Sequence, residues 1–531
     1  MWQIVCKCVG LLTACGLLLS TAAGCSNHTD SLAKKLFDSG IVIDNNLDVE
    51  TVQISESDDT GYYIQISGLR DSTAEDKINR RLKEAADEMY AGTFIPPYRG
   101  ISVKLKQSES LPKSQNIYMY TECNWNHILS VCAYYYASYY DQKTPEQSLS
   151  YGYEIPLTFD LTTGDEMTLK DLFTPGTDYI EQVNRAVDQY LMHNGFDGGA
   201  EEYEDTGVNA SEEIALTAPF RSIEPDQKFL LAGNGNLYLV MDYDTPVFYN
   251  GYYPITVDIP SDDLGEVFTP FRSTDKPLYQ SERKNCHLLT EMTDRSEARQ
   301  KELSARVSFY GEYRYSHNTP EALLPQLEAL TFDESQSPIA YDEVCRQVTD
   351  LFGHENWRLN IMTSARSSTV KSHDYYSFTR DCSFWSNEDN AWSEDNPNPE
   401  TYYRNYQTAY CFDRDGHTVA LRDLFCQPEQ ADKLIADAME RSLIQAVSEE
   451  TAISEEDAHK YVSLLFPHIN GVSVESVCLY ISFDLSNAQL DEIFRECFGE
   501  VENSNLYSYG VSYLTYQDIG CENLILFRDA F

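Results

Sequence analysis

Two stretches of the sequence place matched aspartates where a pair of carboxylates could act as general acid and base. Residues 159–173 read FDLTTGDEMTLKDLF, and residues 412–425 read FDRDGHTVALRDLF. General acid–base catalysis uses carboxyl groups that the fold holds at a fixed separation. With Thr163 taken as an insertion, the identities pair Phe159, Asp160, Gly164, Leu169, Asp171, Leu172 and Phe173 with Phe412, Asp413, Gly416, Leu421, Asp423, Leu424 and Phe425.

A structural role accounts for the same aspartates without a substrate. Asp160 and Asp413 flank a glycine turn, where Asp side chains commonly bond to nearby backbone groups. Asp171 and Asp423 come just before an expected helix start, where the positive end of the helix dipole favours a negative charge. The sequence therefore predicts a repeated structural joint, and it assigns no catalytic residue.

The other chemical motifs fail on their spacing. Asp413-Arg414-Asp415-Gly416 resembles the start of a calcium loop, but its glycine comes fourth instead of sixth, and Leu424 occupies the twelfth position. No two of the ten histidines are four residues apart, which excludes the HExxH zinc peptidases. The Asp- and Asn-rich residues 387–400 are expected to form a solvated loop. We predict no metal site and no cofactor.

Tyrosine is unusually abundant, with 38 residues that gather in runs such as AYYYASYY (133–140) and TYYRNYQTAY (401–410). Tyrosine stiffens sheets through cross-strand pairs, and this is the simpler interpretation. Adjacent tyrosines on a strand nevertheless point to opposite faces, so some rings must face solvent or a partner. The candidate binding surface comprises Tyr134, Tyr136, Tyr139, Tyr249, Tyr252, Tyr402 and Tyr403.

The elements around these residues alternate between strands and helices. Residues 73–90 place apolar side chains every three or four positions, which predicts a helix, and the Asn-rich break at 124–127 predicts a hairpin. The same order of events recurs after residue 304. We therefore predict an α+β protein of two tandem domains, each an antiparallel sheet with helices packed on one face.

Composition shifts set the expected boundaries. The predicted division is a lipoprotein signal peptide at 1–24, a tether at 25–47, a first domain at 48–272, a linker at 273–303 and a second, divergent copy at 304–531. A length of 531 residues is too great for one ordinary core, which agrees with more than one domain.

The N-terminus and the charge indicate where the chain works. A basic start, an apolar run and small residues before Cys25 resemble a bacterial lipobox, so we expect Cys25 to carry lipid on the outer face of the cytoplasmic membrane. The formal net charge of −46 repels nucleic acid and attracts cationic partners. The ten cysteines after Cys25 permit disulfides in an exported chain, while free buried thiols remain the alternative.

The first domain is similar to a known extracytoplasmic family. Asp160, Thr163, Gly164, Leu169 and Asp171 match its strand-D-x-x-T-G-x-x-x-x-L-x-D-L-F pattern, as do Leu172 and Phe173. This family is shared by the RsiV anti-sigma factor and the non-catalytic part of the PdaC peptidoglycan deacetylase. The resemblance covers 48–270 and, more weakly, 304–531. It implies an extracytoplasmic binding domain, and in RsiV that domain binds lysozyme, a strongly cationic protein.

The leading functional hypothesis is a surface lipoprotein with a non-catalytic binding or sensing role at the cell envelope. Its partners would be the membrane, through the N-terminal lipid, and a cationic protein such as lysozyme or the peptidoglycan of the cell wall. Two alternatives remain open at this stage. One is a glycan-cleaving enzyme that works through carboxylates, and the other is a structural spacer of the envelope.

Overall fold

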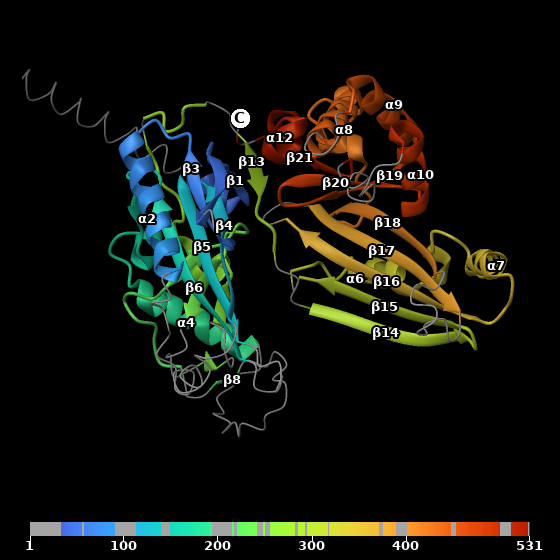
Figure 1. The fold of residues 1–531 in the computed structure, drawn as a ribbon, viewed down its shortest axis with the longest axis horizontal. Helices are drawn as coiled ribbons and strands as arrows, with labels where there is room; N and C mark the ends of the chain where they lie inside the picture. The colour runs from blue at the N-terminus through green and yellow to red at the C-terminus, as the bar shows by residue number, and fades with distance from the viewer. Residues whose placement is uncertain are drawn as a thin grey trace, which may run out of the picture. The chain divides into compact units, whose positions relative to one another are not determined.

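A computed structural model describes most of the chain from residue 33 onward (Figure 1). The segments outside the described residues are 1–32, 56–57, 91–112, 140–148, 194–214, 217–219, 242–247, 250–254, 275, 282–284, 292–294, 317, 371–374, 389–400, 448–452, 500–510, 529 and 531. Cys25 lies among them. Among the described residues, no helix has the length and apolar character that crossing a membrane requires.

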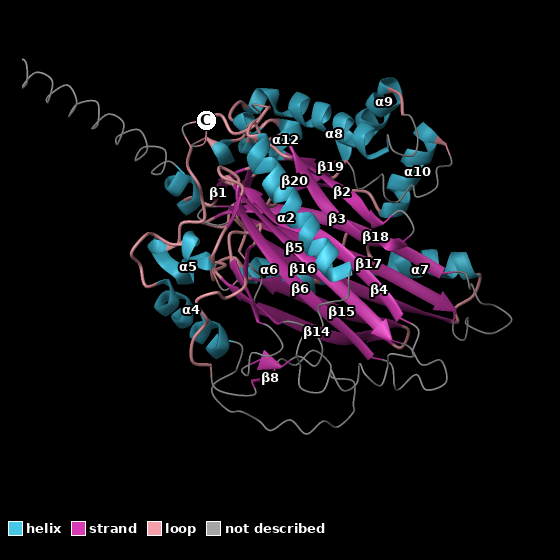
Figure 2. Ribbon diagram, turned by 60° about the vertical axis from the view of Figure 1, so that its left-hand side comes forward, coloured by secondary structure: helices cyan, strands magenta, loops and turns pink. Residues whose placement is uncertain are grey.

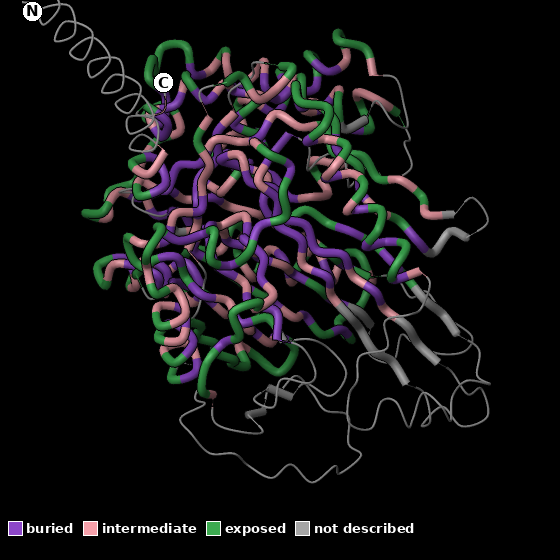
Figure 3. The backbone as a smooth tube through the Cα atoms, turned by 90° about the vertical axis from the view of Figure 1, so that its left-hand side faces the viewer, coloured by how far each residue is buried: buried purple, intermediate pink, exposed green. Residues whose placement is uncertain are grey.

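The fold combines antiparallel sheets with helices, which confirms the predicted α+β class. The chain forms two compact units. Unit 1 contains the segment up to Lys35 together with Ile43–Lys284, and unit 2 contains Leu36–Val42 together with Asn285–Phe531. Figure 3 shows that buried stretches run mainly along the strands, while exposed stretches lie on the outer helices and loops.

The segment expected to be a tether is partly structured. Residues 33–38 are helical, and Leu36, Phe37, Ile41 and Val42 are buried because their side chains are apolar. The backbone amide of Leu289 donates to the carbonyl of Gly40 at 2.8 Å, and residues 36–42 belong to unit 2. The chain consequently changes unit three times, after Lys35, Val42 and Lys284.

A six-stranded sheet organises unit 1. Its strands, in sheet order, are β2 (Asp48–Ser55), β3 (Asp58–Ser67), β4 (Lys113–Trp125), β5 (Ile128–Tyr139), β6 (Leu149–Asp160) and β7 (Asp165–Glu166). Neighbours are antiparallel except β3 and β4, which are parallel. The turn between β4 and β5 consists of Asn126 and His127, both at positive φ, which closes the hairpin that the Asn-rich break predicted.

Helix α2 (Ser72–Tyr90) forms the crossover that the parallel pair requires. Its stripe of Ile78, Leu82, Ala85, Ala86 and Met89 is buried, as the periodicity predicted. The stripe packs on one face of the sheet, against side chains that include Ile117 and Leu157. Figure 2 shows α2 lying over this sheet, with its axis running roughly along the strands.

The rest of unit 1 begins within the first of the two repeated stretches, residues 159–173, which we call the first joint; the second joint is residues 412–425. It comprises the short turn η2 (Leu169–Leu172), helix α4 (Tyr179–His193), strands β8 (Ala215–Leu216), β9 (Phe229–Leu231), β10 (Leu237–Met241), β11 (Phe248–Tyr249) and β12 (Ile255–Ile259), and the turns α5 (Ser261–Leu264) and η3 (Gly265–Val267). β12, β10 and β9 form a second, antiparallel sheet. It packs on the face of the main sheet opposite α2, where Cys132, Leu230 and Val240 form a small apolar cluster.

Unit 2 has a five-stranded sheet with a corresponding pattern. Its strands, in order, are β14 (Arg295–Ser304), β15 (Val307–Tyr315), β16 (Trp357–Thr369), β17 (Tyr375–Glu388) and β18 (Thr401–Asp413). The parallel pair is β15 and β16, and the helices α6 (Leu324–Phe332) and α7 (Tyr341–Phe352), with the turn η4 (Glu334–Gln336), lie between them in the chain. The other pairs are antiparallel. Each main sheet is therefore antiparallel with one parallel pair, a feature that the prediction lacked.

The remaining elements of unit 2 are two smaller sheets and several helices and short turns. Strand β1 (Ile41–Ile43) pairs with β13 (Cys286–Leu288), and a three-stranded sheet contains β19 (Ile469–Val474), β20 (Cys478–Phe483) and β21 (Tyr513–Thr515). The helices and short turns are η5 (Leu421–Leu424), η6 (Pro428–Gln430), α8 (Ala431–Val447), α9 (Glu455–Leu465), η7 (Phe466–His468), α10 (Asn487–Phe498), α12 (Tyr516–Ile519), η8 (Cys521–Asn523) and η9 (Ile525–Phe527).

Two expectations from the sequence differ from the structure. The predicted linker at 273–303 contains β13 and most of β14. β14 is an exposed edge strand, so it lacks the apolar alternation that marks a strand with a buried face. All ten described cysteines are free thiols, and most are buried. This agrees with the expectation of free buried thiols and not with that of disulfides.

Candidate functional site

The first joint holds its aspartate inside its own turn. The carboxylate of Asp160 accepts hydrogen bonds from the amide and the hydroxyl of Thr162, at 2.8 and 2.5 Å. Its other oxygen lies 3.2 Å from Nε of Arg272, and the same arginine donates to the carbonyl of Asp171 at 2.6 Å. Arg272 thus connects the turn to the following segment, and this carboxylate is occupied by structural contacts.

A glycine is required at this joint because the chain passes another backbone closely. Gly164 has a φ of +71°, and a Cβ atom placed there would lie 2.6 Å from the carbonyl oxygen of Ala74 at the start of α2. The joint therefore packs directly on the helix that covers the sheet.

The second pair of aspartates lies inside a 3-10 turn and not just before a helix. Asp171 occupies the third position of η2, and its carboxylate accepts from the amide and hydroxyl of Thr168 at 2.8 and 2.7 Å. Asp423 has the same position in η5 and accepts from the amide of Ala420 at 3.4 Å. Alanine has no hydroxyl, so Asp423 lacks the second bond that Thr168 gives to Asp171.

The joint of unit 2 contains a small group of potential metal ligands. Carboxylate oxygens of Asp413 and Asp415 and a ring nitrogen of His417 lie within 4.8 Å of one another. Asp413 accepts from the backbone amides of Asp415 and His417, at 2.9 and 2.8 Å, and these bonds hold its pKa below the usual value. Asp415 and His417 are exposed, so the arrangement is that of a turn whose aspartate bonds to its own backbone.

The apolar members of both joints lie in or beside the cores. Phe159, Leu169 and Phe173 are buried in unit 1, and Phe412 and Phe425 are buried in unit 2. Leu421 is partly buried. Phe173 and Phe425 each form an isolated bridge to the final segment of their own unit, at Phe268 and Leu524.

The predicted tyrosines divide between the core and the surface. Tyr134 and Tyr136 lie partly exposed on β5, whereas Tyr135 between them is buried against α2. Tyr403 on β18 is exposed. Tyr402 belongs to the core of unit 2, where its hydroxyl donates to Gln347 at 2.7 Å, so its assignment to a binding surface was wrong.

The side chains of the other three tyrosines of the candidate surface lie outside the described residues. Tyr252 lies outside the described residues, and the side chains of Tyr139 and Tyr249 do too, although the backbones of the last two belong to β5 and β11.

Unit 1 gathers tyrosines and carboxylates on the sheet face opposite α2. We call this surface the tyrosine face, and it comprises Tyr118, Tyr120, Tyr134, Tyr136 and Glu154, together with Glu122, which lies in the bulge of β4 and whose charge acts on Tyr120. Tyr118 is directly opposite Tyr134, with ring centroids 5.0 Å apart, and Tyr134 is directly opposite Glu154. Tyr118 and Tyr120 are 43% and 37% exposed, so aromatic surface faces solvent here.

Sequence reasoning missed Tyr118 and Tyr120. The available signal was the alternation in NIYMYTEC, where Ile117 and Met119 face the core and the tyrosines between them face outward. The search for adjacent tyrosines did not detect it, because these two tyrosines are separated by one residue.

The electrostatics beside the tyrosine face favour a positively charged ligand. Burial raises the pKa of Glu122, and it raises the pKa of Tyr120, where the charges of Glu154 and Glu122 add to the effect. Burial also raises the pKa of Asp258 on β12 to about 6, with a further contribution from Glu122. Burial is the main cause of both shifts, so the charged forms of Glu122 and Asp258 are poorly solvated and would be stabilised by an approaching cation.

Comparisons with known proteins find similar solved structures, but no family model and no curated protein. No protein-family model matches the chain. No curated protein matches it either. A crystal structure of a DUF3298 family member from Bacteroides fragilis is similar over 43% of this chain and 95% of its own, with 14% identity and a TM-score of 0.28. A DUF3298 family protein from Pseudomonas aeruginosa PAO1 is similar over 44% and 99%, with 14% identity and a TM-score of 0.27. Both structural neighbours are thus members of a family named as a domain of unknown function.

Proposed function

We propose that this chain is a non-catalytic binding or sensing module of the bacterial cell envelope, and that the tyrosine face of unit 1 binds a cationic protein. The observation that carries the proposal is the row of partly exposed tyrosine rings beside carboxylates whose pKa values are raised. Tyrosine supplies broad contact area at low entropic cost, and its ring also attracts Lys and Arg.

Charge on the whole chain supports the same kind of partner. The net charge of −46 would steer a basic protein toward the surface and speed its association at low salt. Close to the face, Glu154 and Glu122 supply acceptors that could pair with Lys or Arg side chains. Such pairs would be partly desolvated, and this would favour specificity more than raw affinity.

The resemblance to the RsiV and PdaC family agrees with this partner class. The two main sheets share the order antiparallel, parallel, antiparallel, antiparallel, and a joint with a positive-φ glycine follows each. We infer that the units are two copies of one domain. On this proposal Cys25 anchors the chain to the outer face of the cytoplasmic membrane, and a lysozyme-like protein is the expected partner.

The competing hypothesis of a carboxylate-dependent enzyme receives less support. Asp160 is bonded to Thr162 and paired with Arg272, and Asp413 is bonded to its own turn. A general acid or base must reach the substrate proton, and these carboxylates are engaged elsewhere. A structural spacer would not need exposed tyrosines grouped with carboxylates.

The test is to titrate a soluble form of the chain that begins at residue 26, and so keeps the buried residues of 36–42, with lysozyme as the cationic probe. Replacing Tyr118 with Ala should weaken binding about tenfold, because an aromatic side chain in a contact often contributes more than 1 kcal/mol. Glu154→Gln should mainly slow association at low salt. Calorimetry and surface plasmon resonance measure both effects.

Tyr403→Ala is the matched control, since that tyrosine has a similar exposure, 45%, but belongs to unit 2. It should leave lysozyme binding unchanged. Absence of saturable binding at low salt, or equal losses in Tyr118→Ala and Tyr403→Ala, would remove the proposal.

A further inference from the structure

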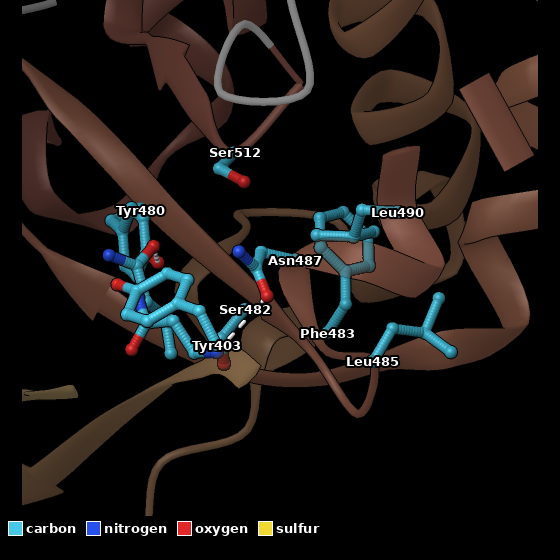
Figure 4. Close-up of a pocket in the computed structure, with 10 residues that line it drawn as sticks. Tyr403, Tyr480, Ser482, Phe483, Leu485, Asn487, Leu490 and Ser512 are labelled. Atoms are coloured by element: carbon cyan, nitrogen blue, oxygen red, sulfur yellow. Dashed lines mark hydrogen bonds between the residues drawn. The ribbon is translucent and has the colours of Figure 1, made fainter. Parts of the chain in front are cut away.

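Unit 2 contains an uncharged pocket that the functional proposal above does not use. It has a volume of about 250 Å³ and lies between the outward face of β18, strand β20 and the start of α10. Figure 4 shows Tyr403 and Tyr480 on one side and Phe483, Leu485 and Leu490 on the other. The pocket is at the small end of the range for ligand sites, which suits one ring-sized group.

Two amide side chains present donors to this pocket. Asn487 accepts the backbone amide of Asn405 through Oδ1 at 3.0 Å, and Asn405 accepts the hydroxyl of Ser383 through its own Oδ1 at 3.0 Å. A backbone amide can only donate, so it fixes the orientation of the Asn487 side chain, and in Asn405 the oxygen is the end that contacts Ser383. Within the described part of the chain, neither NH₂ group has a protein acceptor. Figure 4 shows Asn487 in the middle of the pocket, below Ser512.

The aromatic wall is held in place by hydrogen bonds. The hydroxyl of Tyr480 donates to Oε1 of Gln407 at 2.6 Å, and Nε2 of Gln407 donates to Asp381 at 2.7 Å. Asp381 stands on β17 opposite Gln407, and it does not line the pocket. A ligand therefore meets a surface whose polar groups are already oriented, which lowers the entropic cost of binding.

The absence of charge selects the ligand class. Charged residues make up 23% of the chain, yet none of the ten residues that line this pocket is Asp, Glu, Lys or Arg. A ligand with a carboxylate or an ammonium group would lose its hydration here without gaining a counter-charge. Amide donors, hydroxyls and flat rings instead match a neutral ring that carries hydroxyl groups. The apolar side of the pocket offers a place for a methyl group.

An aromatic platform continues from the pocket. Trp385 on β17 is directly opposite Tyr403 on β18, and the two side chains are 39% and 45% exposed. Side chains that are opposite on neighbouring strands share one face of a sheet. The apolar faces of sugar rings stack on such side chains, so a second ring could lie beyond the first.

We propose that this pocket binds an uncharged, N-acetylated sugar ring, and that Trp385 and Tyr403 hold the next ring of the same glycan. The amide donors of Asn405 and Asn487 meet the hydroxyl and carbonyl oxygens of the ring, and the apolar side receives the acetyl methyl group. This site goes beyond the binding of a cationic protein, because it lies in unit 2 and takes a neutral ligand.

The test uses saturation-transfer NMR and calorimetry on the soluble chain. N-acetylglucosamine and its β-1,4-linked trimer should bind, the trimer more tightly, whereas glucosamine should not, because its ammonium group finds no counter-charge. Tyr403→Ala should weaken the trimer about tenfold through loss of the stacked ring. The matched control is Tyr62→Ala, since Tyr62 is also exposed, at 37%, but belongs to unit 1 and does not line the pocket.

The choice of ligand distinguishes two sources of the glycan, peptidoglycan and a neutral glycan. The peptide-free disaccharide of peptidoglycan carries a lactyl carboxylate, so it should bind through its N-acetylglucosamine ring and more weakly than a neutral disaccharide of the same length. Tighter binding of the peptidoglycan disaccharide would overturn the assignment to a neutral glycan. So would equal losses in Tyr403→Ala and Tyr62→Ala, binding of stem peptides alone, or no saturation transfer with any acetylated sugar. Lysozyme binding by Tyr403→Ala is measured in parallel, so that the two proposals fail separately.

Discussion

Asp258 offers a sharp test of the electrostatics beside the tyrosine face. Its side chain accepts a hydrogen bond from Asn236 at 2.8 Å and is directly opposite Tyr238 on β10. Burial raises its pKa from 3.8 to about 6, and Glu122 adds to the effect. The carboxylate of Glu122 disfavours the negative charge of Asp258, and the hydrogen bond from the Asn236 amide favours it. Replacing Asp258 with Asn removes the charge but keeps an oxygen that can accept the same bond.

The magnitude follows from the linkage between protonation and folding. Between about pH 4 and pH 6 the folded chain holds a proton on Asp258 that the unfolded chain has lost, so stability falls as the pH rises through this window. At about 1.4 kcal/mol per pH unit, the cost at neutral pH is at most about 3 kcal/mol. Asp258→Asn should therefore raise the free energy of unfolding of unit 1 by about 1 to 3 kcal/mol at pH 7 and have little effect at about pH 4.

Hydrogen exchange measured by mass spectrometry on peptides from β10 and β12 can read this effect, because it reports unit 1 separately from unit 2. The protection of these strands should fall between about pH 4 and pH 6.5 in the natural chain, after correction for intrinsic exchange, and should stay level in Asp258→Asn. An equal pH dependence in both proteins, or a loss of protection in the variant at neutral pH, would refute the reasoning.

Two further outcomes are expected from the joints and the N-terminus. Gly164→Ala should destabilise unit 1 by about 2 kcal/mol or more, because φ is +71° and the new Cβ would meet backbone of Ala74; Gly416→Ala should cost about 1 kcal/mol, since its nearest neighbour is the flexible end of Gln326. Thermal denaturation of both variants checks this contrast, and equal costs would contradict it. Cys25→Ser should release the chain from the membrane fraction of a bacterial host that processes lipoproteins, and fractionation measures it; retention in the membrane would oppose a lipid anchor.

The fold class followed from local patterns, because both signals on which it rests are strong. The stripe from Ile78 to Met89 repeats at helical spacing, and the Asn-rich turn separates two apolar runs. The order of strands in space depends on long-range pairing, which leaves little mark on the sequence. The sequence of the exposed edge strand β14 therefore resembles that of a linker. Residues 36–42 likewise resemble a tether in sequence, although they belong to unit 2.

The candidate site could be predicted only in part. Counting adjacent tyrosines found Tyr134 and Tyr403, but it could not tell which face of a strand is covered, so it also selected the buried Tyr402. The carboxylates of the tyrosine face come from separate strands, and Asp258 gains its raised pKa only when β12 packs beside β10. Such a cluster has no local sequence signature.

If the two units are copies of one domain, as we propose, the contrast between the joints and the faces indicates how they could take different ligands. The joints keep a glycine at positive φ and an aspartate in the following turn, because backbone packing at Gly164 allows no side chain and the turn needs its cap. Residues on the outward sheet faces carry no such constraint, since they do not fix the path of the chain. Unit 1 could therefore acquire carboxylates beside Tyr118, and unit 2 amides beside Tyr403, without disturbing either fold. Function in this chain should accordingly be sought where the two units differ, on those faces.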